Sequence, residues 1–289
     1  MKKFLFVSLT LCFVLGMTLA RAEEKPALGT VKSADGVEIR YEVRGSGNPA
    51  LVFVHCWQCD RSYWEQQLPH FAAKYTVVAL DLAGHGESGH NRTVWSPETY
   101  ARDVQAVVEH LKLPQVILIG HSMGGPVVAE AAPLLPGKVL AIIGIDTFNN
   151  IGQIPDPKQM EPFFAAMKAN FAATTDGFIR GMMFPAGADP ALVDRIARDM
   201  SSGPADIGIA SMESLWKLNL GPVLEQAGVP VYCVNADKFP TDTAAGQKHA
   251  KLFKVRILPG TGHFLFLEKP GEFNKLLDET LAEILTAKP

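Results

Sequence analysis

One short stretch constrains the fold of this 289-residue chain more than any other. Residues 116–119 are four aliphatic side chains, and they lead directly into a G-x-S-x-G pentapeptide at 120–124. A continuous apolar run before such a pentapeptide predicts a buried strand that turns sharply into a helix. The glycines on both sides of Ser122 let the two backbones approach closely and tolerate a strained turn. The pattern therefore predicts an exposed serine at a strand end, beside the N–H groups of a helix start.

The remainder of the chain alternates apolar runs with amphipathic helical stretches. This alternation predicts an α/β protein in which a mostly parallel sheet carries helices on both faces. Residues 28–44 are expected to form a hairpin around Asp35 and Gly36, because apolar and polar residues alternate on both sides of that turn. The other expected strands are 50–54, 75–81, 138–146, 229–235 and 254–258, and the clearest expected helices are 62–71, 96–111 and 273–285.

Residues 1–22 have the pattern of a secretory signal peptide. Lys2 and Lys3 form a basic start, residues 4–20 are an apolar run, and residues 20–22 fit an A-x-A cleavage site. The apolar run is at the lower limit for a membrane span, and no charged stop-transfer flank follows it, so we expect no stable membrane anchor. The sequence predicts cleavage after Ala22 and a periplasmic or secreted mature protein.

The charge and the cysteines limit the other interpretations. Without Lys2, Lys3 and Arg21, the 27 basic residues become 24 against 30 acidic ones, a formal net charge of −6. No Lys/Arg cluster stands out, so a nucleic-acid partner is not expected. The mature chain keeps Cys56, Cys59 and Cys233, an odd number, so at least one thiol stays unpaired or pairs between chains.

The C-x-x-C pair at 56–59 has several interpretations. It is compatible with a small-loop disulfide, a redox pair or half of a metal site. No second C-x-x-C or H-x-H supports zinc, so no metal is expected. A structural disulfide and two buried thiols both stay open.

Four motifs in order resemble those of α/β-hydrolases. Residues 55–57, with Trp64, resemble the H-G-W…W loop, and residues 80–88 resemble the D-x-x-G-x-G-x-S loop. Residues 120–125 are similar to the nucleophile elbow, and residues 262–264 to the histidine loop. The resemblance implies an α/β-hydrolase core at 23–148 and 229–289, with a helical cap at 149–228 inserted after the sixth strand.

The resemblance also implies a set of catalytic groups. Ser122 takes the position of the nucleophile, and His263, which follows the last strand, takes that of the base. The N–H groups of Met123 and Trp57 correspond to the oxyanion hole. Cys56 departs from the family pattern, which usually has glycine there, and a side chain at this position restricts the loop backbone. No metal or organic cofactor is implied.

The acid that orients His263 has three candidates, which all lie between Ser122 and His263 in the chain. Asp237 and Asp242 follow the strand that ends at residue 235, the commoner position in the family, and Asp237 has the more familiar spacing to His263. Asp242 is also placed to cap a helix. Asp146 ends the strand after the nucleophile helix, a position that some family members use. The spacing to His263 therefore favours Asp237.

The segment 149–228 is rich in methionine and aromatic residues, most of which are expected to form the core of the cap. Some are expected to line an apolar pocket that faces Ser122. The residues concerned are Met160, Phe163, Phe164, Met167, Phe171, Phe178, Met182, Met183, Phe184, Met212 and Trp216.

Together these features predict an exported serine hydrolase that cleaves a carboxylic ester of a small, largely apolar substrate. A lactonase, a C–C hydrolase or a cofactor-free perhydrolase uses the same triad, and a hydrolase-like ligand receptor is the alternative from another class. Ser122 argues against haloalkane dehalogenase and epoxide hydrolase chemistry, which in similar proteins starts from an aspartate.

Overall fold

The computed structural model describes residues 25–153 and 156–287, so the predicted signal peptide lies outside the described residues. Its centre is an eight-stranded sheet in the order β1-β2-β4-β3-β5-β6-β7-β8. β1 and β2 form a hairpin, β2 also pairs antiparallel with β4, and every other pairing is parallel. The strands are β1 (Ala27–Lys32), β2 (Glu38–Arg44), β3 (Ala50–Val54), β4 (Val77–Leu80), β5 (Val116–His121), β6 (Val139–Ile145), β7 (Val231–Ala236) and β8 (Phe253–Leu258). The predicted fold class is confirmed.

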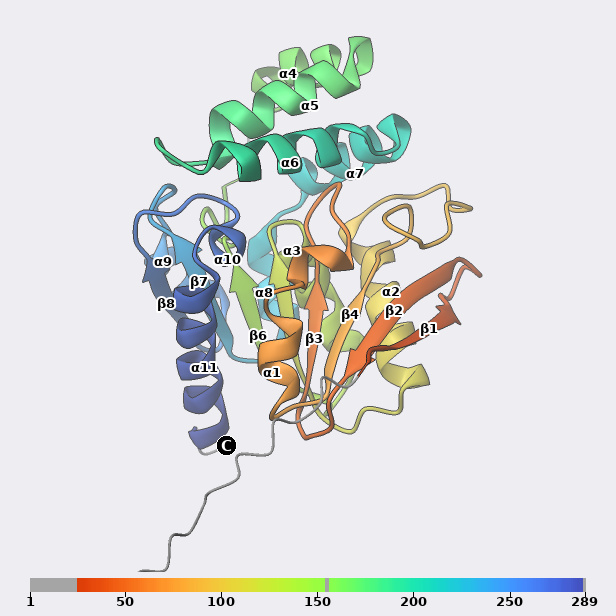
Figure 1. The fold of residues 1–289 in the computed structure, drawn as a ribbon, viewed down its shortest axis with the longest axis vertical. Coiled ribbons are helices and arrows are strands. Elements are labelled where there is room, and N and C mark those ends of the chain that lie inside the picture. Colours follow the sequence, from red (N-terminus) through yellow and green to blue (C-terminus); the bar gives the residue numbers. More distant parts are fainter. Residues whose placement is uncertain (1–24, 154–155, 288–289) are drawn as a thin grey trace, which may run out of the picture.

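Helices cover both faces of this sheet (Figure 1). α1 and α11 lie on one face, whereas α2, α3 and α8 pack together on the other. The helices are α1 (Leu68–Ala72), α2 (Pro97–His110), α3 (Gly124–Ala131), α4 (Pro157–Ala169), α5 (Phe171–Phe178), α6 (Pro190–Ser201), α7 (Ala205–Lys217), α8 (Leu220–Ala227), α9 (Thr243–His249), α10 (Leu265–Glu268) and α11 (Pro270–Thr286). The other helical segments are the 3-10 helices η1 (Arg61–Trp64) and η2 (Ala132–Leu134) and the π-helical η3 (Ile179–Met183).

One predicted helix differs from the structure. The stretch 62–71 is split into η1 and α1, because Pro69 has no N–H to continue a helical ladder and instead occupies the first turn of a new helix. The helix predicted over 96–111 forms as α2, where the side chains of Ser96 and Thr99 make a reciprocal capping box.

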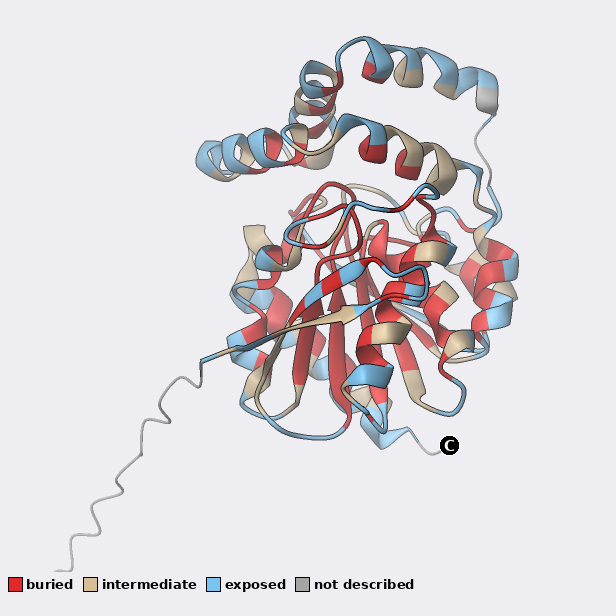
Figure 2. Cartoon of the chain, turned by 90° about the vertical axis from the view of Figure 1, so that its right-hand side faces the viewer, coloured by how far each residue is buried: buried red, intermediate tan, exposed pale blue. Residues whose placement is uncertain are grey.

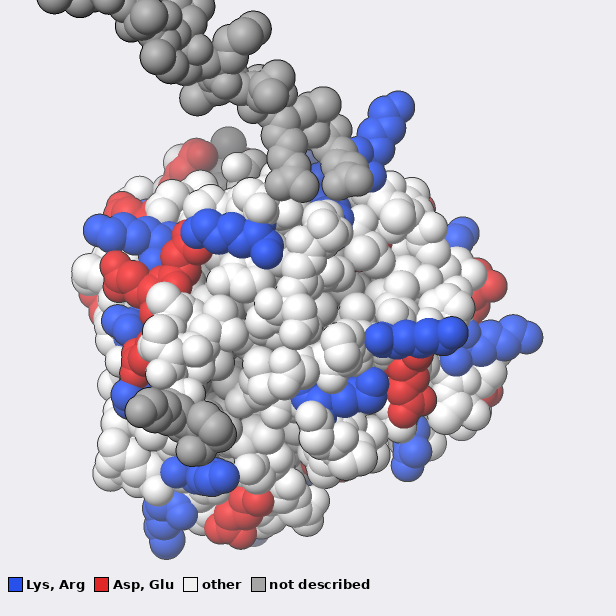
Figure 3. Space-filling view, turned by 90° about the horizontal axis from the view of Figure 1, so that it is seen from below, with Lys and Arg blue, Asp and Glu red and all other residues white. Residues whose placement is uncertain are grey.

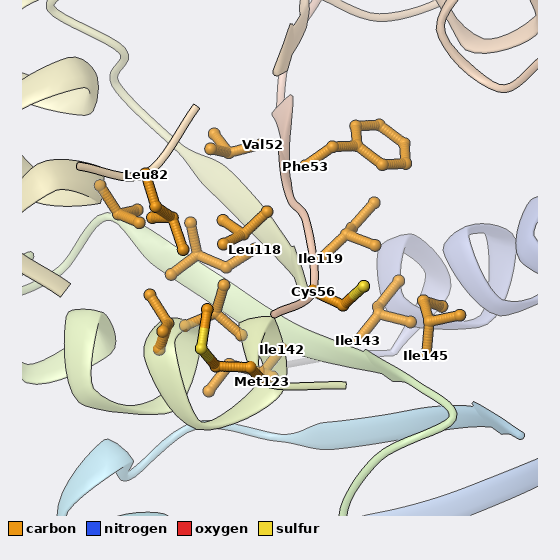
Figure 4. Packing of buried hydrophobic residues seen from close by; sticks show 14 of the residues in the cluster. Val52, Phe53, Cys56, Leu82, Leu118, Ile119, Met123, Ile142, Ile143 and Ile145 are labelled. Atoms are coloured by element: carbon orange, nitrogen blue, oxygen red, sulfur yellow. The ribbon is translucent and has the colours of Figure 1, made fainter. Parts of the chain in front are cut away.

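The hydrophobic core lies on both faces of the central strands. Every residue of β3, β4 and β5 is buried (Figure 2). Figure 4 shows how Val52, Phe53, Leu118, Ile119 and their neighbours on β6 fill the space between sheet and helices. Full burial of such a side chain stabilises a fold by roughly 1.5–3 kcal/mol, so the strand that leads to Ser122 is firmly held.

Helices α4, α5, α6 and α7 lie above the carboxyl ends of the parallel strands (Figure 1). α8 falls within the range 149–228 predicted for the cap, but it packs against α3 and α9. The segment that covers the strand ends is therefore shorter than that range, and it ends with α7 at Lys217. Its position places a helical wall opposite the end of β5, where Ser122 stands.

Charged side chains of both signs are interspersed on the face opposite these helices (Figure 3). Ion pairs on the surface include Lys74 with Asp278 at 3.3 Å, and both residues are partly exposed, so such a pair adds little stability. Within residues 25–153 and 156–287, none of the helices combines the length and the apolar character that a membrane span requires.

Candidate active site

Ser122 occupies the turn between β5 and α3. Its backbone φ is 52°, in the left-handed region that non-glycine residues rarely adopt, and its N–H donates to Ile145 O at 3.0 Å. A Cβ on Gly120 would lie 2.2 Å from the Gly124 carbonyl oxygen, and a Cβ on Gly124 would lie 2.6 Å from Val54 O. The two glycines are therefore required because strand, helix and the end of β3 meet without room for a side chain.

His263 lies in the loop after β8, and its backbone is held from two sides. Its N–H donates to Met183 O at 2.7 Å, and its carbonyl oxygen accepts from His121 Nε2 at 2.8 Å. The Nδ1 atom of its ring is 2.6 Å from Asp146 Oδ2. An ionised carboxylate can only accept, so the proton is on Nδ1 and Nε2 is left as the acceptor. This is the tautomer that a general base needs.

Asp146 follows the last residue of β6 and has a backbone φ of 42°. Its carboxylate also accepts from the Ala236 N–H at 3.0 Å, through Oδ1. Its N–H donates to Val234 O at 3.1 Å, so the β6 end is tied to β7. Two hydrogen bonds to the two oxygens of a buried carboxylate fix its orientation toward His263.

The prediction that Asp237 orients His263 is wrong. The Asp237 carboxylate instead accepts the Gly260 N–H at 2.9 and 3.0 Å, and this backbone hydrogen bond lowers the pKa of Asp237. Asp242 caps α9 by accepting from Ala245 N at 2.9 Å, as the helix-cap alternative predicted. Asp146, the third candidate, is the residue that contacts His263.

Asn235, at the end of β7, fastens the chain next to the acid. Its side-chain amide donates to Thr147 O at 3.1 Å, and its Oδ1 accepts from Thr147 N at 3.3 Å. The Asn235 side chain thus pairs with both the N–H and the carbonyl oxygen of Thr147, as a neighbouring strand would, and both residues are buried. The end of β7, which was expected to supply the acid, therefore holds the backbone of Thr147, the residue that follows Asp146.

Glu268, on α10, supports the histidine loop and was not predicted. The Gly262 N–H donates to both of its carboxylate oxygens at 3.0 Å. Burial raises the pKa of Glu268, although the hydrogen bond from Gly262 opposes this shift. The sequence does indicate this role, because Glu268 is an acidic residue that closely follows the Gly262 loop, whose N–H needs an acceptor.

The predicted oxyanion donors lie at the ends of β3 and β5. Met123 is the N-terminal flanking residue of α3, and Figure 4 shows it at the first turn of that helix, with Cys56 on the chain that leaves β3. In the described part of the chain, the N–H groups of Trp57 and Met123 donate to no protein acceptor. The Trp57 ring is anchored through Nε1, which donates to Gly208 O of α7 at 2.8 Å. Both amides are thus without a protein acceptor in the part of the chain that the structure describes.

A cavity of about 160 Å³ lies between the helices above the sheet and the end of β5. Ser122 and His263 line its floor with Cys56 and Trp57, and the cap supplies the rest of the lining. The cap residues are Phe178, Ile179, Met183, Met200, Met212, Leu215 and Trp216. Four of them were among the eleven predicted, whereas Ile179, Met200 and Leu215 were not. Apart from the thiol of Cys56 and the two catalytic candidates, every lining side chain is aliphatic, aromatic or a thioether.

The other histidines of the motif loops have structural roles. His55 accepts from Leu82 N at 2.9 Å through Nε2, while its Nδ1 donates to Cys56 O at 2.8 Å. Burial lowers the pKa of His55, His85 and His121, and that of His85 falls to about 3. A lowered pKa makes each ring a weak base, and none of the three lines the cavity with Ser122 as His263 does.

The three cysteines of the described residues are free thiols, and all three are buried. Cys56 and Cys59 nevertheless lie together, with 2.6 Å between their sulfur atoms. Burial raises the pKa of the Cys233 thiol, which lies apart from them on β7. The structure thus presents the C-x-x-C pair as two adjacent thiols.

Comparisons with known proteins place the chain in a family and support its fold. The sequence model of the family described as "Alpha/beta hydrolase family" matches residues 51–276. The chain is 27% identical to 3-oxoadipate enol-lactonase 2 of Acinetobacter baylyi, over 86% of this chain and 95% of that protein. It is 29% identical to strigolactone esterase RMS3 of Pisum sativum, over 86% and 98% respectively. Among solved structures, a bromoperoxidase from Bacillus anthracis superposes with a TM-score of 0.79 at 21% identity, over 89% of this chain and all of that one.

Proposed function

Because the chain belongs to the alpha/beta hydrolase family, we propose that it is a serine hydrolase that cleaves a carboxylic ester of a small, uncharged substrate. The observation that carries the proposal is the pairing of His263 with Asp146 at 2.6 Å, at the floor of a cavity that Ser122 also lines. Two relatives support ester-type chemistry, since one is named an enol-lactonase and the other an esterase.

In the proposed mechanism, His263 Nε2 takes the proton of Ser122 Oγ as the oxygen attacks the ester carbonyl. The imidazolium that forms is stabilised by the buried carboxylate of Asp146. The N–H groups of Met123 and Trp57 hold the negative oxygen of the tetrahedral intermediate. His263 then protonates the departing alkoxide. In the second half of the reaction His263 takes a proton from water, the water oxygen attacks the acyl carbon, and His263 returns the proton to the departing Ser122 oxygen.

The size of the cavity supports a small acyl or alkyl group. An apolar cavity of about 150 Å³ holds a benzene molecule, whereas sites for drug-sized ligands begin at about 300 Å³. At about 160 Å³, this cavity matches a phenyl ring or a short aliphatic chain. Its lining offers no Arg or Lys to a carboxylate, so a charged substrate would lose its hydration without compensation. We therefore propose neutral esters, short-chain or aryl, as the substrate class.

We propose in addition that the mature protein acts outside the cytoplasm, because residues 1–22 have the pattern of a signal peptide. N-terminal sequencing of the protein recovered from a periplasmic fraction of the expression host tests this. A start at Glu23 supports export with cleavage after Ala22, and a full-length chain confined to the cytoplasm would contradict it.

The central experiment measures turnover of p-nitrophenyl acetate, butyrate, octanoate and phenylacetate by the wild type and by Ser122→Ala. We expect turnover that falls for octanoate, and a loss on the order of 10⁴ to 10⁶ in kcat for the variant. Circular dichroism and thermal melting show whether the variant is folded. A single stoichiometric burst on every ester, without turnover, would instead support a ligand receptor.

A further inference from the structure

The pair Cys56 and Cys59 flanks Trp57, the residue whose N–H is proposed above to hold the oxyanion. Their sulfur atoms are 2.6 Å apart, and a disulfide bond is about 2.05 Å long. The backbone between them already forms a closed turn, in which Cys59 N donates to Cys56 O at 3.3 Å. The sulfur atoms can therefore bond with a side-chain movement of less than about 1 Å.

The turn that carries the Trp57 N–H contains a strained residue. Gln58 has a φ of 55°, a left-handed conformation without the freedom of glycine. Such a conformation persists only where its surroundings hold it. The hydrogen bonds from Trp57 and Gln58 to the helices above are made by their side chains and not by their backbone groups. They run from Trp57 Nε1 to Gly208 O at 2.8 Å and from Gln58 Nε2 to Pro204 O at 3.4 Å. A covalent ring through Cys56 and Cys59 would hold the backbone itself.

The two thiols differ in their access to a small reagent. Both side chains are almost fully buried, but Cys56 lines the cavity with Ser122, whereas Cys59 does not. The Cys59 sulfur lies against Cys56 and the buried Tyr63. Burial raises the pKa of the Cys59 thiol well above its ordinary value, so this thiol stays protonated at neutral pH. A reagent that enters the cavity therefore meets Cys56 first.

From these observations we propose that Cys56 and Cys59 form a reversible disulfide that locks the oxyanion loop, and that the oxidised protein is the more active form. The part that concerns activity rests on the proposed hydrolase function. The oxidant is a small disulfide, R–S–S–R. The Cys56 thiolate attacks one of its sulfur atoms and releases R–S⁻, which leaves Cys56–S–S–R. The released R–S⁻ takes the proton of the Cys59 thiol, and the Cys59 thiolate attacks Cys56 Sγ. The Cys56–Cys59 bond forms, and the second R–S⁻ leaves.

The proposal predicts a change in kcat with little change in KM, because the Trp57 N–H acts on charge that develops in the transition state. Complete loss of an oxyanion donor costs about 10² to 10³ in kcat. A loosened donor costs less, and we expect the reduced form to be about three- to tenfold slower. The amides of Trp57 and Gln58 should also exchange hydrogen more slowly in the oxidised form.

The experiment treats the full chain with 2-hydroxyethyl disulfide or with dithiothreitol. A disulfide is preferred to peroxide because Met183, Met200 and Met212 line the same cavity and would form sulfoxides. Both cysteines lie in the tryptic peptide 45–61, so oxidation makes that peptide lighter by two hydrogen atoms and blocks alkylation. Hydrogen exchange of the same segment gives a measurement that does not depend on activity.

Three variants separate the steps. Cys59→Ala should trap the mixed disulfide on Cys56, seen as one added thiol group, and Cys56→Gly should gain no such group. Cys233→Ala is the matched control, since this buried thiol lies on β7, and it should keep the full response.

Each result then supports or overturns the proposal. A lighter peptide, slower amide exchange and a higher kcat after oxidation support it. An unchanged peptide mass, or an oxidised loop whose amide exchange and kcat equal those of the reduced form, would overturn it. If neither form turns over esters, the hydrolase function fails, while the peptide mass and the amide exchange still decide whether the disulfide locks the loop.

Discussion

The contact between Asp146 and His263 leads to a sharp prediction for Asp146→Asn. The two carboxylate oxygens have different partners: Oδ1 accepts from the Ala236 N–H at 3.0 Å, and Oδ2 faces His263 Nδ1 at 2.6 Å. In the variant, the amide oxygen must stay toward Ala236, because an NH₂ group there would face another donor. The NH₂ group then points at His263 Nδ1, which has to accept.

An accepting Nδ1 puts the proton of His263 on Nε2, where it blocks the removal of the Ser122 proton. In a serine protease triad, the same substitution lowers kcat by about 10⁴. We expect a loss of that order here, which corresponds to about 5.4 kcal/mol of transition-state stabilisation. Because the variant keeps the size of the side chain and the Ala236 hydrogen bond, KM and the fold should change little.

The assay compares kcat for p-nitrophenyl butyrate in Asp146→Asn, Asp237→Asn and Asp242→Asn. The last two are matched controls, since Asp237 holds Gly260 and Asp242 caps α9, and both should keep at least about a tenth of the wild-type kcat. Thermal melting shows whether Asp146→Asn is folded. The reasoning is refuted if the folded Asp146→Asn keeps more than about a tenth of the kcat, or if Asp237→Asn loses more than about 10³.

Three further predictions concern packing, pH and the cavity. Gly124→Ala should lower the free energy of unfolding by about 1–3 kcal/mol in urea titrations, because its Cβ would lie 2.6 Å from Val54 O. The control Gly177→Ala on α5, where a Cβ meets nothing within 4 Å, should not destabilise the fold, and an equal loss in both variants would contradict the packing argument. His85 gains a proton near pH 6.5 in the unfolded chain, but its pKa in the folded chain is about 3, so its contribution to stability is full above pH 6.5 and falls as the pH drops toward 3. The free energy of unfolding lost between pH 7 and pH 5 should therefore be about 2 kcal/mol smaller in His85→Gln than in the wild type, and parallel pH profiles of the two proteins would disprove this. Met200→Trp should fill the cavity and lower kcat/KM at least about tenfold for the butyrate ester relative to the acetate, and an equal change for both would place the acyl group elsewhere.

The sheet and the elbow were predictable because local sequence determines them. The apolar run at 116–119 leads into glycines that the crossing of strand and helix requires, and both features are continuous in the chain. His263 could be located in the same way, since it follows the last strand within a recognisable loop. In these cases the element and the functional residue are neighbours in sequence.

The acid could not be determined in this way. Asp146 and Asp237 both follow strands that end at the same edge of the sheet, and their spacing to His263 does not reveal which side chain points to it. Which aspartate reaches His263 depends on the φ of 42° at Asp146 and on the Ala236 N–H that binds its carboxylate, and both are tertiary features. The cavity lining was only partly predictable for a similar reason, because apolar residues such as Met200 and Leu215 have the same pattern whether they face the cap core or the substrate.

The hydrogen bonds between Asn235 and Thr147 secure the backbone next to Asp146 at the point where the chain leaves the sheet toward the helices that surround the cavity. Thr147 follows the acid directly, and Asn235 fastens it to β7 before the chain leaves the sheet. A chimera that replaces the segment from residue 149 to the end of α7 would leave this fastening and Asp146 untouched, provided that the graft supplies a carbonyl oxygen in place of Met183 O for the His263 N–H. Such grafts would change the substrate preference while the proton-transfer groups stay in register, whereas a graft that begins at Thr147 would release the acid. The molecule thus offers a defined boundary at which new specificities can be exchanged.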